Sequence, residues 1–290
     1  MGRVWIAVFA AVTLASLAQA AELDAWAYRQ KTGDAAFAQA RDALSHDVEA
    51  TPADVGKADR LARLMIAAAS VSRDDYGVRA GRFDKALAET RAQLATMRSG
   101  PYPADWAQDR WLKDRDQASD PLARELFARV FLDQKQFHLD ADLKGPEAEA
   151  FDLVLTAERD RNVADNAAWL RGVMVRIGWF DISKYGPDAS QGAWLLVQHA
   201  DHEPAWQQAV LDALAPRVKT GDMQGKYYAY LVDRVAVNAG RPQVYGTQGG
   251  CHGPGDWRPK PVADPDGLEA RRAEVGLQSS ADYKALFTCR

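Results

Sequence analysis

Beyond its first twenty residues, the chain has no apolar run close to the roughly 20 residues that a membrane-spanning helix needs. The sequence therefore predicts no membrane span. It also has no excess of basic residues, because 36 Lys and Arg stand against 40 Asp and Glu, for a formal net charge of −4. An acidic chain without a stripe of Lys or Arg has no electrostatic footprint for nucleic acid. Nucleic acid is therefore excluded as a partner.

Recognisable catalytic motifs are absent as well. The sequence has no Ser nucleophile motif, no Gly-rich phosphate loop and no metal signature. It therefore predicts no cofactor, and it names no reaction.

The first twenty residues have the pattern of a secretory signal peptide. A short basic start with Arg3 precedes an apolar run over residues 4–17, and Ala18-Gln19-Ala20 ends the segment with small outer residues. We expect cleavage after Ala20 and a periplasmic or secreted mature protein. Because no Cys follows the cleavage point, a lipid-anchored form would lack its attachment atom.

Cysteine is scarce, and the only two are Cys251 and Cys289. In an oxidising compartment two such thiols can pair, so we expect a disulfide that holds the C-terminal tail. The alternative is a thiol nucleophile at Cys251 assisted by His252. Adjacent residues seldom place their side chains for that partnership, which favours the disulfide.

Apolar residues recur with helical spacing along almost the whole mature chain, while strand signals are weak. Thr51-Pro52 predicts the start of one helix, as N-cap and first helical residue. Gly and Pro concentrate between Gly240 and Pro265, which predicts a long loop. Further helices are predicted over residues 82–98, 146–159, 166–177, 189–200 and 204–218.

The predicted fold class is therefore all-α, a multi-helix array with a long irregular loop near the C-terminus. About 270 mature residues can bury one large core or two smaller ones. A polar stretch after Gly100-Pro101 favours a domain boundary near Ser119. The predicted organisation is a signal peptide at 1–20, an N-terminal helical region at 21–118 and a C-terminal helical domain at 119–290.

Five sequence motifs in the C-terminal half together resemble those of the bacterial domain-of-unknown-function family 6624. The resemblance covers about residues 120–287 and leaves the N-terminal helices unexplained. The family has no established activity, so the resemblance implies where a site lies without implying a reaction. The words are Asn166-Ala-Ala-Trp-Leu170, Ala193-Trp-Leu-Leu-Val-Gln-His-Ala-Asp201, Ala229-Tyr-Leu-Val-Asp-Arg-Val235, Gly240-Arg-Pro-Gln-Val-Tyr-Gly-Thr-Gln248 and Arg271-Arg-Ala-Glu-Val-Gly-Leu277.

Two residues depart from the family pattern. Phe137 stands where the family helix has an Arg after Asp133-Gln134, and Phe180 stands where Pro often follows Gly-Trp. A polar role at position 137 is therefore not expected here.

The Gln198-His199-x-Asp201 word ends one predicted helix before Pro204 begins the next. His199 beside a carboxylate could act as a general base whose tautomer that carboxylate fixes. Alternatively, His199 and His202 with Asp201 could hold a metal ion. A third interpretation is structural, with Asp201 capping the Pro204 helix and His199 hydrogen-bonded in the core.

Asp233 and Arg234 lie in the middle of an apolar helix, where adjacent side chains point about 100° apart. A structural ion pair is one interpretation, because charges inside an apolar helix tend to be paired. The functional interpretation gives Arg234 an anionic group of a substrate, which its planar guanidinium suits.

The loop from Gln243 to Gln248 follows that helix directly. Its amides, the Tyr245 phenol and Gly246 suit a loop that holds a ligand by hydrogen bonds. The same groups could instead satisfy buried helix ends. Binding residues often gather on loops held by a rigid scaffold, which favours function slightly.

These residues define a hypothetical polar pocket with three possible uses. It could be hydrolytic, with Arg234 or Gln248 stabilising an oxyanion, or it could hold a small polar molecule or peptide without turnover. In the third hypothesis the same residues are internal scaffolding and the N-terminal helices dock a protein. The catalytic candidates are His199, Asp201 and Asp233, and the ligand-binding candidates are Gln198, Arg234, Gln243, Tyr245 and Gln248.

Overall fold

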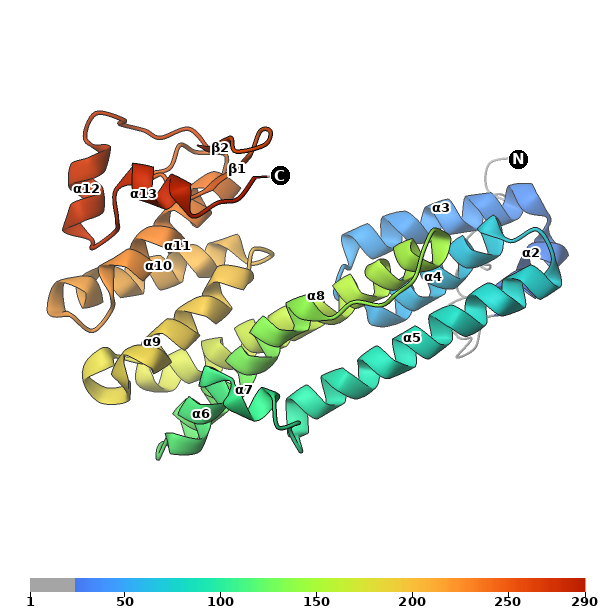
Figure 1. The fold of residues 1–290 in the computed structure, drawn as a ribbon, viewed down its shortest axis with the longest axis horizontal. Coiled ribbons are helices and arrows are strands. Elements are labelled where there is room, and N and C mark those ends of the chain that lie inside the picture. The colour runs from blue at the N-terminus through green and yellow to red at the C-terminus, as the bar shows by residue number, and fades with distance from the viewer. Residues whose placement is uncertain (1–23, 290) are drawn as a thin grey trace, which may run out of the picture. The chain divides into compact units, whose positions relative to one another are not determined.

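The computed structural model describes residues 24–289. The predicted signal peptide lies outside the described residues. Two compact units can be distinguished, and the chain passes between them more than once (Figure 1). The N-terminal unit contains residues 24–103 together with residues 132–164, and the C-terminal unit contains residues 104–131 together with residues 165–289. The boundary expected near Ser119 falls inside the first segment of the C-terminal unit.

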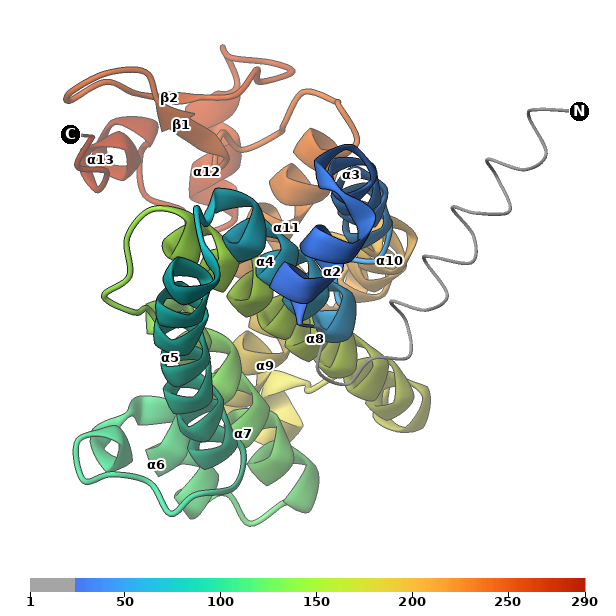
Figure 2. The ribbon, with the colours of Figure 1, turned by 90° about the vertical axis from the view of Figure 1, so that its right-hand side faces the viewer.

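The N-terminal unit is built from helices that pack side by side around an apolar core (Figure 2). Leu64, Ile66 and Phe83 are completely buried there, and Leu94 and Met97 nearly so. Its first four helices are α2 (Ala25–Thr32), α3 (Asp34–Ala50), α4 (Val55–Ala69) and α5 (Arg73–Ser99).

Helix α4 starts later than the sequence predicts. Pro52 lies in a turn, and the N-cap is Asp54, whose side chain accepts a hydrogen bond from the Lys57 backbone N–H at 3.0 Å. Asp is at least as good an N-cap as Thr, so the prediction that Thr51-Pro52 opens the helix was wrong by one turn.

Helix α8 (Pro146–Ile177) is a single element of 32 residues, of which residues 146–164 belong to the N-terminal unit. The predicted break between Arg159 and Asn166 does not occur. Residues 160–165 contain neither Pro nor Gly, and Val163 is buried, so nothing interrupts the helical hydrogen bonds.

The C-terminal unit is also predominantly helical. Its core includes Trp179, Phe180 and Leu231, which are 1% exposed or less. The prediction of an all-α fold is confirmed. Its elements are η1 (Trp106–Gln108), α6 (Arg110–Gln117), the first part of α7 (Pro121–Lys135), the last part of α8, α9 (Ile182–His199), α10 (Pro204–Thr220), α11 (Gly225–Asn238), α12 (Leu268–Glu274) and α13 (Ser280–Ala285).

The long loop after α11 carries a small antiparallel sheet of two strands, β1 (Gly249–Cys251) and β2 (Trp257–Pro259). Cys251 at the end of β1 forms a disulfide with Cys289, with 5.6 Å between their Cα atoms. The predicted pairing of the two cysteines is therefore confirmed. No helix among residues 24–289 has the length and apolar character required to cross a membrane.

Candidate functional site

Asp233 of α11 holds the loop that follows its own helix. Its carboxylate is fully buried and accepts four hydrogen bonds. The backbone N–H groups of Val244 and Tyr245 donate to Oδ1 at 2.7 and 2.9 Å, and the N–H and hydroxyl of Thr247 donate to Oδ2 at 2.8 and 2.9 Å. A carboxylate has about four acceptor positions, so this one is saturated by the loop.

The carbonyl groups of the same loop are bound from the other side. Arg271 Nε donates to the carbonyl of Val244 at 3.2 Å, and Arg272 Nη1 donates to that of Tyr245. The Tyr283 hydroxyl donates to the Thr247 carbonyl at 3.0 Å, and burial raises the pKa of Tyr283 to about 12, so this donor keeps its proton at neutral pH. The loop is thus held between one buried anion and two cations.

Gln243 closes the loop from within. Its side-chain amide donates to the carbonyls of Gln248 and Lys260 at 2.9 and 2.7 Å, and its Oε1 accepts from the Gln248 backbone N–H at 2.8 Å. Gln243 is fully buried, and Gln248 is half-buried with its own amide donating to the Thr247 hydroxyl at 3.2 Å. The structure therefore brings these two predicted ligand-binding amides together, bonded to the loop.

Asp201 meets Arg234 across two elements. Arg234 Nε donates to Asp201 Oδ1 at 2.8 Å and Nη2 donates to Oδ2, while the amides of Asn238 and Gln207 donate to Oδ1 at 2.8 and 3.2 Å. Burial opposes the charge of Asp201, but the guanidinium and the two amides outweigh it and lower its pKa. This half-exposed network ties the turn after α9 to α10 and α11.

The other predicted residues lie at the end of α9, in the turn after it and in the loop after α11. Gln198 is buried and His199 half-buried at the end of α9, and His202 in the turn lies 3.6 Å from a carboxylate oxygen of Glu203. Tyr245 is half-buried, and burial raises the pKa of its phenol. Within residues 24–289, no group of three His, Cys, Asp or Glu side chains is gathered as a metal ion would require.

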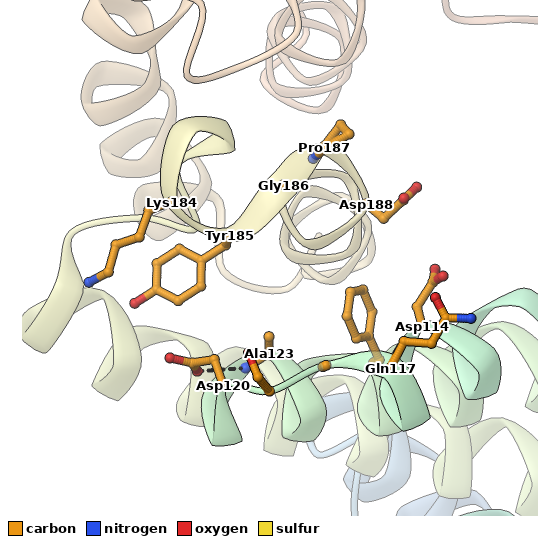
Figure 3. Close-up of a pocket in the computed structure, with 12 residues that line it drawn as sticks. Asp114, Gln117, Asp120, Ala123, Lys184, Tyr185, Gly186, Pro187 and Asp188 are labelled. Carbon is orange, nitrogen blue, oxygen red and sulfur yellow. Dashed lines mark hydrogen bonds between the residues drawn. The ribbon is translucent and has the colours of Figure 1, made fainter.

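A separate cavity of about 280 Å³ lies between α6, the start of α7 and the start of α9 (Figure 3). Its walls include the Phe127 ring and the Tyr185 phenol. Asp114 and Asp188 lie at one end of the cavity, and Tyr185, Lys184 and Asp120 at the other.

The three carboxylates of this cavity differ in how they are satisfied. Asp120 caps α7 by accepting from the N–H groups of Leu122 and Ala123 at 2.8 and 3.2 Å. Asp188 accepts from Arg110 Nη2 at 3.0 Å. The Asp114 carboxylate has no hydrogen-bond or ion-pair partner among the described residues, and burial together with the nearby charge of Asp188 raises its pKa.

Gly186 makes the shape of the cavity possible. Its φ of 82° and ψ of 165° break α9 after its first turn, and Pro187 begins the main helical segment. A positive φ is strained for residues with a Cβ, although no heavy atom lies within 4 Å of a Cβ built there. Phe180, one of the two departures from the family pattern, packs edge-on against Tyr185 with 5.0 Å between ring centroids and so supports the cavity wall.

The sequence signals for this cavity were weak. Asp114 lies in a polar stretch that the sequence presents as a connection between domains. The Gly186-Pro187 pair was the available signal, because it interrupts a helical pattern close to two charged residues and a Tyr. Arg272 was part of a family word, but nothing in its neighbourhood indicated a completely buried guanidinium.

Comparisons with known proteins identify one relationship. No curated protein and no solved structure matches the chain. A protein-family model matches residues 121–289, which is more than half of the chain. The match contains the loop of residues 243–248 that Asp233 holds, the Asp201–Arg234 network, and the α7 and α9 walls of the cavity. Helices α2–α6 lie outside it. The chain belongs to the family of unknown function DUF6624.

Proposed function

We propose that this protein is an exported ligand-binding module, and that the cavity between α6, α7 and α9 holds a small zwitterionic molecule such as an amino acid or short peptide. The observation that carries the proposal is the Asp114 carboxylate, which faces the cavity and has no hydrogen-bond or ion-pair partner among the described residues, the charge of Arg110 acting on it only from a longer distance. A buried or half-buried carboxylate is normally paired, so an ammonium group of a ligand is its natural complement.

The opposite end of the cavity suits the other half of such a ligand. The Lys184 ammonium forms no ion pair with any described residue, and its nitrogen lies 4.9 Å from the centroid of the Tyr185 ring. An ammonium and a phenol together can donate to a carboxylate or a peptide carbonyl. Phe127 and Tyr185 supply the apolar surface that a ligand pocket usually combines with a few polar groups.

Binding is better supported than hydrolysis because the predicted catalytic carboxylates are already engaged. A general base must accept a proton from the substrate, and Asp233 has its acceptor positions filled by residues 244–247. Asp201 is bound by a guanidinium that lowers its pKa, which makes it a weaker base. Hydrolysis with His199 as base stays a prediction from the sequence.

Export is supported by two independent features. The leader pattern of residues 1–20 is typical of secretion, and a disulfide is a bond that oxidising compartments preserve. Both point to the periplasm or the extracellular medium as the place where a ligand would be met.

The proposal is tested by ligand-observed NMR on the mature full chain with the standard amino acids and alanyl-alanine, each at about 1 mM, a concentration that detects millimolar dissociation constants. We expect saturation transfer to at least one zwitterion, and a higher midpoint of thermal unfolding in its presence. The ligand spectrum should not change with time, whereas steady loss of alanyl-alanine would identify a peptidase and overturn a purely binding role.

The matched variants are Asp114→Asn and Asp116→Asn. Both remove one carboxylate from α6, but Asp116 is exposed, contacts Arg115 and does not line the cavity. We expect the first variant to lose binding at least tenfold and the second to bind like wild type. Equal affinity in all three proteins would exclude this cavity as the site.

A further inference from the structure

Within the N-terminal unit, helices α5 and α8 are connected at two places by a buried Glu that binds two Arg side chains. The carboxylate of Glu147, which is 2% exposed, accepts from Arg79 Nη1 at 2.9 Å and from Arg82. About three turns further along α8, Glu158 is 5% exposed and accepts from Arg91 Nε at 3.3 Å and from Arg161. Each buried glutamate is thus bound by two arginines, which is the arrangement that makes burial of its charge tolerable.

The second of these ion-pair clusters, at Glu158, borders a cavity in which arginines outnumber carboxylates. This cavity has a volume of about 340 Å³. The arginines that line it are Arg91, Arg98 and Arg161, and Glu158 is the only carboxylate in its wall. Arg98, in the last turn of α5, pairs with no described carboxylate, and Leu94 and Val55 form the apolar part of the wall.

The charged side chains that line this cavity have a net positive charge. Three guanidinium groups and one carboxylate leave two positive charges in excess, because Glu158 neutralises only one of its two partners. Arg98 occupies a favourable position near a helix C-terminus, which accounts for its presence there. That position does not account for its convergence with Arg91 and Arg161 around an open volume.

We propose that this cavity is a binding site for a small dianion, of the chemical class of phosphate, phosphate monoesters or dicarboxylates. Guanidinium groups donate paired hydrogen bonds to the oxygens of such groups, and two net charges would be neutralised on binding. The proposal is independent of the zwitterion site, because this cavity lies in the other unit. Arg91 and Arg98 lie outside the family match, and Glu158 and Arg161 lie inside it.

The test is isothermal titration of the mature full chain, in a buffer free of other oxyanions, with inorganic phosphate and separately with succinate. We expect one site per chain for at least one of the two anions, with affinity that falls as salt is added. Binding of phosphate alone would identify a phosphoryl site, and binding of succinate alone a dicarboxylate site. No binding of either at about 10 mM, well above millimolar dissociation constants, would overturn the proposal.

Arg98→Gln is the diagnostic variant, because Arg98 is exposed and bonds to no other described side chain, so its loss leaves the Glu158 pairs intact. Its matched control is Lys85→Gln, which removes one exposed positive charge from the same helix outside the cavity. We expect the Arg98 variant to bind the anion at least tenfold more weakly and the Lys85 variant to bind within twofold of wild type. An equal loss in both would show that only the general field of α5 attracts the anion and would refute a built site.

Discussion

Asp233 and Asp114 both belong to the C-terminal unit, and they differ in whether protein groups donate hydrogen bonds to their carboxylates. Asp233 accepts four hydrogen bonds from its own chain, and the loop it holds is bound again by Arg271 and Arg272. Asp114 faces a cavity without any such partner among the described residues. The first arrangement stabilises a fold, and the second leaves interaction capacity for a ligand.

This difference shows that a segment rich in charged and amide residues can stabilise the fold without forming a ligand site. The words around Asp201, Asp233 and Gln243 are dense in charged and amide groups, and density alone made them candidates for a site. In the structure most of that capacity is consumed internally, in a loop that would otherwise carry unpaired backbone groups into the interior. Unused hydrogen-bonding capacity is the better indicator of a ligand site.

The largest predicted effect is that of Asp233→Ala. The substitution leaves three backbone N–H groups and the Thr247 hydroxyl without their buried acceptor, so we expect the free energy of unfolding to fall by about 3–5 kcal/mol. Urea denaturation of the mature chain measures this. Asp212→Ala, an exposed Asp on α10 that accepts only from Gln208, is the control and should stay within about 0.5 kcal/mol of wild type. A comparable loss in both variants would remove the special status of Asp233.

The disulfide should have the next largest effect. Cys251 and Cys289 are 38 residues apart, and replacing both by Ser should cost about 2–4 kcal/mol through a less restricted unfolded chain. Reduction of wild type should give the same shift in the urea midpoint. If reduction leaves that midpoint unchanged, the disulfide contributes nothing to the stability of the C-terminal unit.

A smaller effect is expected at the Asp201–Arg234 pair. Because the pKa of Asp201 is lowered in the folded state, its contribution is fully present above its ordinary value of 3.8 and is lost as pH falls through the lowered value. The pair is partly exposed, with side-chain exposures of 30% and 42%, so solvent screening limits the contribution to about 0.5–1 kcal/mol. Asp201→Asn should therefore be less stable than wild type at pH 7, and the two proteins should converge as pH falls below the lowered pKa of Asp201. A constant difference across that range would assign the stabilisation to packing.

The smallest effect on stability is expected for Asp114→Asn, although its effect on binding is large. The pKa of Asp114 is raised in the folded state, so the contribution of this group is favourable below 3.8 and is lost as pH rises through the raised value. At neutral pH the charged form is a small cost, and the variant should be equal to wild type or slightly more stable. A clear loss of stability at pH 7 would show that Asp114 is a structural residue.

The sequence predicts those features whose information is local or compositional. Helical periodicity predicted the fold class, and two cysteines with a leader pattern predicted the disulfide. Helix α8 was divided wrongly because residues 160–165 are mostly polar, although they contain no helix breaker and Val163 is buried. The neighbours Asp114 and Asp188 could not be predicted, because only tertiary packing brings α6 against the Gly186 break of α9.

The most direct test of the distinction between the two carboxylates is a pair of urea denaturation curves at pH 7, for Asp233→Asn and Asp114→Asn. Both variants replace one carboxylate oxygen by an NH2 group and leave the size and shape of the side chain nearly unchanged. We predict a much lower midpoint for the Asp233 variant and an unchanged or slightly higher midpoint for the Asp114 variant. Equal shifts, or a larger loss at Asp114, would contradict the assignment of one carboxylate to the fold and the other to a ligand.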